Sequence, residues 1–180
     1  MTPILGIMAS QISGHLATPN NYESIATTTL STTASSITFS SISATYTHLQ
    51  IRGINLASVT NENVRIQFNS DTGSNYSYHY IYGNGSSAGA SGTASTAYLL
   101  IGLNGSTSAA GACVVDVLDY ANTNKYKTTR SLIGNDQNGS GYALLISGNW
   151  RSTSAISTIT ISPLSGTFNT YTSYALYGVK

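Results

Sequence analysis

Apolar and polar residues alternate along much of this chain with a period of two, which is typical of β-strands that bury one face. Leu49 and Ile51 alternate with polar neighbours, and Val64, Ile66 and Phe68 repeat the pattern further along. Gly, Asn and Ser interrupt these runs at intervals of about 8 to 12 residues, as in antiparallel sandwiches and barrels. The pattern predicts strands at Tyr22 to Leu30, Ser36 to Ile42, Thr47 to Leu56, Asn63 to Phe68, Tyr76 to Tyr82, Thr96 to Leu103, Ala112 to Tyr120, Thr128 to Ile133, Tyr142 to Ser147, Ile156 to Ser162 and Tyr174 to Val179.

Helical periodicity is nearly absent, so the chain is expected to be all-β. We predict that residues 21–180 form a two-sheet antiparallel sandwich of jelly-roll type. Asn-Gly pairs that begin at Asn84, Asn104 and Asn138 predict tight hairpin turns, because both residue types tolerate positive φ angles. The stretch from Gly83 to Ser95 consists almost only of small residues, and we expect a long loop there.

Residues 1–20 are expected to form an extended N-terminal arm. The segment is mildly apolar and has no Lys or Arg, since the first basic residue is Arg52, so it lacks the positive start of a secretory signal. An apolar segment without a core of its own favours aggregation unless it packs against another surface. We interpret it as an assembly arm, with a plain terminus or an additional strand as the alternatives. Its expected anchoring residues are Ile4, Leu5, Ile7, Met8 and Ile12.

The composition is polar but nearly uncharged. Of the 180 residues only 7% are charged, 41% are hydrophobic and 13 are Tyr, and the formal net charge is +1. Without a basic patch the chain lacks the electrostatic attraction of a nucleic-acid-binding protein, and no segment approaches a membrane span. We therefore expect neither a nucleic-acid partner nor membrane insertion. Lys125 and Lys127 lie in the most polar stretch and are expected to face solvent, whereas Cys113 is expected to be buried.

The motifs that could carry chemistry favour structural roles. Ser87 lies in a Gly-x-Ser-x-Gly pattern, but the helix that follows a hydrolase nucleophile is not predicted. Asp116 and Asp119 are three apart in a strand, so they point to opposite faces and make a poor acid–base pair. The three His residues are dispersed, which disfavours a zinc site. The loop containing Asp71 resembles a calcium loop without its closing Glu, and a turn is the favoured reading. We expect no catalytic residues, no metal and no cofactor.

A stripe of tyrosines is the most prominent candidate for a binding surface. Tyr76, Tyr78, Tyr80 and Tyr82 fall on one face of a predicted strand, because successive side chains of a strand alternate between faces. Aromatic rings can stack on sugars or pack against another subunit. We take these residues and Trp150 as candidate contacts for a glycan or a second subunit, with an ordinary packed face as the alternative.

Several sequence segments of the chain resemble those of small virion proteins that are common in tailed bacteriophages of aquatic environments, including the cyanophage type. The resemblance spans nearly all of residues 22 to 180, and the start of the chain resembles the N-terminal arms of those proteins. The segments are Gly6 to His15, Tyr22 to Thr27, Thr38 to Ile42, Ala44 to Gly53, Phe68 to Tyr76, Asp116 to Thr128 and Tyr174 to Lys180.

The resemblance implies a component of a bacteriophage virion, made in the host cytoplasm and displayed on the outer surface of the particle. We expect a capsid decoration or cement protein that attaches by its arm, self-associates as a trimer and contacts other virion proteins such as the major capsid protein. The short length of the chain favours this role. A projecting fibre needs a shaft, and a shaft would show as sequence repeats or heptads, which this sequence lacks. The alternative is a tail-fibre or baseplate adhesin that recognises host surface glycan. A glycan-cleaving enzyme is the least favoured class.

Overall fold

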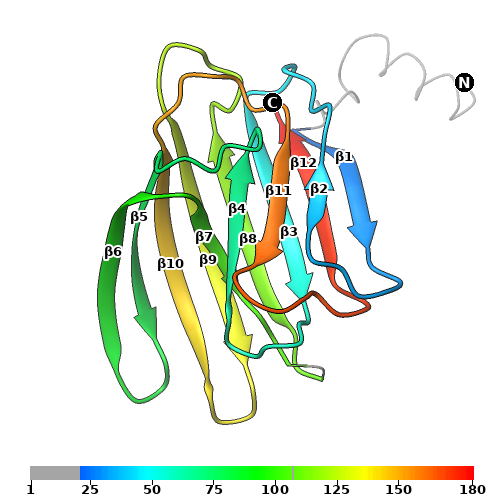
Figure 1. Ribbon diagram of the computed structural model, residues 1–180, viewed down its shortest axis with the longest axis vertical. Helices are drawn as coiled ribbons and strands as arrows, with labels where there is room; N and C mark the ends of the chain where they lie inside the picture. Colours follow the sequence, from blue (N-terminus) through cyan, green and yellow to red (C-terminus); the bar gives the residue numbers. More distant parts are fainter. Residues whose placement is uncertain (1–20, 107) are drawn as a thin grey trace, which may run out of the picture.

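Two antiparallel sheets make up the fold (Figure 1). The computed structural model describes residues 21–106 and 108–180, so the predicted arm lies outside the described residues. The large sheet has the spatial order β1 (Tyr22–Thr29), β12 (Ser173–Val179), β3 (His48–Asn55), β8 (Gly111–Leu118), β9 (Lys127–Asp136), β10 (Gly141–Trp150), β5 (Tyr76–Gly83) and β6 (Ala88–Thr96). The small sheet has the order β2 (Ile37–Phe39), β11 (Ile159–Pro163), β4 (Asn63–Phe68) and β7 (Leu99–Leu103). The predicted all-β class and the two antiparallel sheets are confirmed.

The core lies between the two sheets and follows the alternation of the sequence. Leu49 and Ile51 of β3 are fully buried on the face toward the small sheet. Val64, Ile66 and Phe68 of β4 face them from the other side and are also fully buried. One side of each of these two strands therefore supplies the core, as the pattern predicts.

The small sheet covers only part of the large one. Its edge strand β7 contacts β8, β9, β10 and β5, while β5, β6 and the lower ends of β9 and β10 extend beyond it in Figure 1. Burial along β5 follows this boundary: Tyr76 and Tyr78 are buried, whereas Tyr80 and Tyr82 are half-buried. The sandwich is therefore open at one end of the large sheet.

The predicted loop from Gly83 to Ser95 is wrong, because most of it forms the edge strand β6. Because its residues are nearly all small, the segment shows no alternation of apolar and polar side chains, but its backbone pairs with that of β5. A Cβ atom on Gly89 would lie 2.8 Å from the ring of Tyr82, and one on Gly92 would lie 2.4 Å from the ring of His79. Aromatic side chains of β5 thus lie across glycines of β6, which is a known way of stabilising glycine in a strand.

The Asn-Gly pairs have different outcomes. Asn138 and Gly139 have φ angles of 56° and 106° in the β9–β10 turn, as predicted for a tight hairpin. Asn84 also lies in a hairpin connection, between β5 and β6. The prediction at Asn104 is wrong, because the chain passes there from the small sheet to the large one. Asn104 is fully buried, and its side-chain oxygen accepts a hydrogen bond from Asn55.

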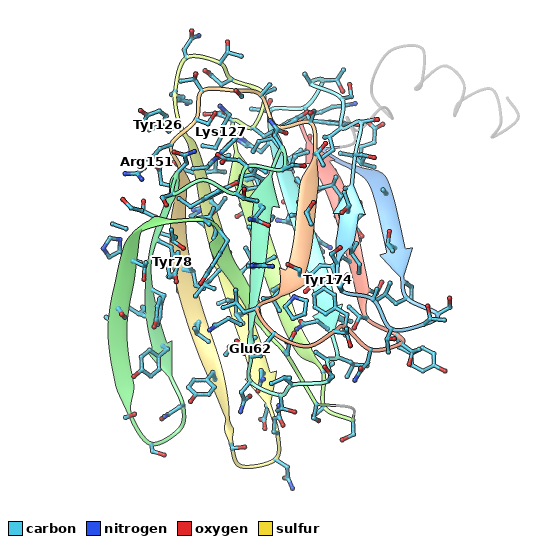
Figure 2. The ribbon with its side chains drawn as sticks, in the orientation of Figure 1. Glu62, Tyr78, Tyr126, Lys127, Arg151 and Tyr174 are labelled. Atoms are coloured by element: carbon cyan, nitrogen blue, oxygen red, sulfur yellow. The ribbon has the colours of Figure 1, made fainter. Side chains whose placement is uncertain are left out.

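Lys127 is buried, which corrects the prediction that it faces solvent. Its ammonium group donates hydrogen bonds to the backbone carbonyls of Asn122, Lys125 and Thr153. Burial, with the nearby charge of Lys125, lowers the pKa of Lys127. The three carbonyl acceptors offset part of the cost of burying the ammonium group. Lys127 therefore connects two loops at the upper end of the sandwich, where Figure 2 labels it beside Tyr126 and Arg151.

We expect Lys127→Ala to lower the free energy of unfolding by about 3 kcal/mol, because it removes buried hydrogen bonds from a charged donor and leaves a cavity. Lys125→Ala is the matched control: its side chain is 56% exposed and its pair with Asp119 lies at the surface, so the expected change is below about 1 kcal/mol. Urea denaturation of both variants tests this. Equal effects for the two lysines would contradict the structural role of Lys127.

Candidate functional site

The tyrosine stripe forms a ladder on the inner face of the large sheet, which is the face toward the small sheet. Ring centroids lie 6.3 Å apart for Tyr78 and Tyr80, 6.1 Å for Tyr80 and Tyr82, and 6.2 Å for Tyr82 and Tyr142 of β10. Figure 2 labels Tyr78 on the left-hand part of the large sheet. The predicted shared face is present, and Tyr142 extends it.

The upper end of this stripe belongs to the core. Tyr76 is fully buried and Trp150 is 2% exposed, and their rings stack 6.2 Å apart. The Tyr76 hydroxyl accepts a hydrogen bond from the backbone N–H of Phe68 at 3.0 Å, and burial raises its pKa to about 12. Neither Tyr76 nor Trp150 reaches the surface. The structure therefore corrects the prediction that these two residues contact a glycan or a second subunit.

Asp71 fixes the loop beside this aromatic cluster. Its carboxylate accepts hydrogen bonds from the indole N–H of Trp150 at 2.8 Å, from the backbone of Gly73 at 2.8 Å and from the amide of Asn75. Partial burial alone would raise the pKa of Asp71, but these three donors outweigh it and lower the pKa. The favoured turn reading of this loop is confirmed.

The lower end of the stripe is accessible. Tyr80, Tyr82 and Tyr142 are half-buried where the small sheet ends. Ser91 of β6 lies directly opposite Tyr80 and is exposed, so a hydroxyl borders the rings. Rings with one free face and a neighbouring hydroxyl suit contact with a sugar or with a protein.

The outer face of the large sheet, away from the small sheet, carries a feature that the sequence did not predict. Four exposed apolar side chains lie side by side on adjacent strands and form what we call the ridge. Val114 is 39% exposed, Leu132 63%, Leu145 50% and Ile81 57%. Each is the cross-strand partner of the next. The signal in the sequence was the interruption of alternation, as in Leu144-Leu145-Ile146, where both faces of a strand are apolar.

A row of small residues, the trough, runs parallel to the ridge. It consists of Ala112, Gly134, Ala143 and Gly83, which are also consecutive cross-strand partners on the same four strands. They line an open depression of about 690 Å³. A Cβ atom on Gly134 or Gly83 would meet no atom within 4 Å. We call the ridge and the trough together the outer patch.

Among the residues weighed for chemistry, His48 and Asp119 are in contact, since the backbone N–H of Asp119 donates to Nδ1 of His48 at 3.0 Å. Asp116 accepts hydrogen bonds from Gln50 at 2.9 Å and from Arg130 at 3.3 Å. Asp119 pairs with Lys125, whose hydrogen bond lowers its pKa. Ser87 lies in the β5–β6 hairpin connection and donates to Asn84.

Cys113 is buried, as predicted, and its burial raises the pKa of the thiol to about 12. A thiol with so high a pKa is protonated at neutral pH and is a poor nucleophile. The part of the chain that the structure describes contains no helix long and apolar enough to cross a membrane.

The predicted arm residues lie outside the described residues, so their placement stays a prediction. They are Ile4, Leu5, Ile7, Met8 and Ile12. Comparison of this chain with protein-family models, with curated proteins and with solved structures finds no match.

We expect Asp71→Asn to reduce stability in a pH-dependent way. A carboxyl group with a lowered pKa in the folded chain stabilises the fold above its unfolded pKa and loses this contribution as the pH falls through its folded pKa. The stability difference between wild type and variant should therefore be largest near neutral pH and shrink below the ordinary value of 3.8. Fluorescence of Trp150, the one tryptophan of the chain, reports unfolding in urea. A difference that stays constant from pH 7 to pH 3 would contradict this account.

Proposed function

We propose that this protein is a structural component of a bacteriophage virion, and more specifically a decoration protein on the shell. The observation that carries the proposal is the outer patch, since exposed contiguous apolar surface on a soluble domain marks a protein–protein contact. The ridge and the trough themselves contain no charged side chain, and uncharged surface is desolvated at lower cost than charged surface. The resemblance of residues 22 to 180 to small phage proteins supports the virion setting.

The remaining parts of the proposal concern attachment. Residues 1–20 act as an arm that binds the major capsid protein or a neighbouring subunit, and residues 21–180 form the displayed domain, a sandwich of jelly-roll type that self-associates as a trimer. Many weak contacts repeated by the symmetry of a shell give firm attachment without any single strong residue. The role is non-enzymatic and needs no cofactor. The antiparallel pairing of every strand pair in both sheets supports the sandwich type.

A second candidate function is a receptor-binding adhesin of the tail. It is supported by the accessible end of the tyrosine ladder at Tyr80, Tyr82 and Tyr142, where rings lie about as close as stacked aromatic pairs do. In this alternative a host surface glycan would lie across the rings beside β6. The two functions differ in location on the particle and in the surface that carries them.

We expect that replacing the five apolar arm residues Ile4, Leu5, Ile7, Met8 and Ile12 with Ser leaves a folded domain that no longer joins the particle, because the arm loses its apolar contacts. The matched control replaces the polar arm residues Gln11, Ser13 and Thr18 with Ala and should be incorporated normally. Circular dichroism checks folding, and quantification in purified tailless heads checks incorporation. The wild type should occur in those heads in numbers comparable with the shell protein. Absence of the wild type from tailless heads would refute the decoration role.

For the adhesin alternative, Tyr80→Ala and Tyr82→Ala should each weaken glycan binding about fivefold, since one stacked ring contributes about 1 kcal/mol. Tyr126→Ala is the control, because Tyr126 is 53% exposed and lies at the other end of the sandwich. Glycan arrays and host-adsorption assays measure the effect. If neither wild type nor variants bind the host envelope, the alternative is excluded.

A further inference from the structure

The ridge and the trough have the same length and lie on the same strands, which is the central observation here. Each of the strands β8, β9, β10 and β5 carries one large apolar residue of the ridge and one small residue of the trough. The two residues are two positions apart on the strand. In β9 these are Leu132 and Gly134, and in β10 they are Leu145 and Ala143. Side chains two apart point to the same face of a strand. The outer patch is therefore a raised band beside a hollow band of equal extent.

We propose that the outer patch binds the outer patch of a second copy of this chain, so that two large sheets pack face to face about a two-fold axis. An axis that runs along the boundary between ridge and trough reverses the strand direction of the second copy and places its trough over the ridge of the first. Leu132 then enters the space above Gly134 of the second copy, and the reverse contact forms at the same time. Such mutual contacts define a two-fold interface.

Two charged residues that flank the outer patch, Arg130 and Asp136, fit the same axis, and Arg130 also lies 3.3 Å from the Asp116 carboxylate of its own chain. Arg130 lies two positions beyond Leu132, and Asp136 lies two positions beyond Gly134, on the opposite side of the boundary. Both side chains are exposed on the outer face, with Arg130 64% exposed. The two-fold operation that places Leu132 on Gly134 also places Arg130 opposite Asp136 of the second copy. Opposite charges at the rim of an apolar contact favour this register over its alternatives.

The available area suits a second copy. The four strands of the outer patch together with the adjoining edge strand β6 span about 24 Å at their usual spacing, and eight residues of strand span about 26 Å. This gives a flat footprint of roughly 600 Å², which is of the same order as the roughly 800 Å² per partner of a stable interface. Two sheets that pack in this way lie about 10 Å apart with interdigitating side chains.

Other occupants fit less well. A single extended segment would cover the ridge or the trough but would leave Arg130 and Asp136 without partners outside the chain. Among residues 21–106 and 108–180, no element packs on the outer face, so the surface is accessible to a second copy. The pairing does not rest on the virion role proposed above, because it concerns the isolated chain in solution, whereas the trimer proposed above forms on the particle.

Sedimentation equilibrium of the full chain tests the proposal, and the expected result is a mass twice that of one chain. Gly134→Leu should raise the dissociation constant at least tenfold, because the new side chain fills the trough. It should leave the fold intact, since Gly134 has a negative φ angle and open space at its Cβ position. Thr27→Leu is the matched control: Thr27 is exposed in the cross-strand row of the ridge, next to the row of Gly134 and four strands from β9. It should leave the dissociation constant unchanged.

A charge exchange gives a second test that does not depend on Gly134→Leu folding well. Arg130→Asp alone and Asp136→Arg alone should each weaken pairing, because each brings like charges together across the axis. The double variant should restore pairing, and damage to the fold cannot produce such a restoration. A monomer at about 100 μM, a concentration well above the dissociation constant of a stable dimer, would overturn the proposal. So would a trimer whose mass does not respond to Gly134→Leu or to the charge exchange.

Discussion

The structure depends on the unequal size of its two sheets. A sheet buries apolar surface only where a second layer covers it, and here a four-stranded layer covers part of an eight-stranded one. Where the cover is present, Tyr76 and Trp150 form the core with Phe68. Where it ends, Tyr80 and Tyr82 keep one side open. The other face of the large sheet has no layer from the described residues and carries the ridge. The two candidate binding surfaces, the accessible tyrosines and the ridge, both result from the unequal size of the two sheets.

The sequence predicted the strands that bury one face, because one-sided burial itself produces alternation. Leu49, Ile51 and Val64 are examples, and all are fully buried. It could not predict β6, since a strand of small residues has no apolar face and is held by pairing with the aromatic strand β5. Nor could it predict the burial of Lys127, because one of the carbonyls that accept its hydrogen bonds belongs to Thr153, in a loop 26 residues further along the chain. The missing information in both cases is tertiary.

The candidate surfaces were predictable to different degrees. The tyrosine stripe could be read from alternation, but which rings stay accessible depends on where the small sheet ends. For the outer patch, the sequence showed that Leu132, Leu145 and Ile81 break the alternation of their strands. Their alignment into one ridge depends on the register of strands that are distant in sequence. A weak signal on each strand becomes a continuous apolar surface only when the strands are side by side.

We propose that this protein functions by assembly, on the shell of a particle and in face-to-face contact with copies of itself. Cryo-electron microscopy of the intact virion, with the density of this chain located, tests it most directly. The account predicts copies arranged with the symmetry of the shell, with the outer faces of two large sheets packed against each other. Density only at the tail, with the outer face of the large sheet in solvent and the tyrosine end directed outward, would contradict it.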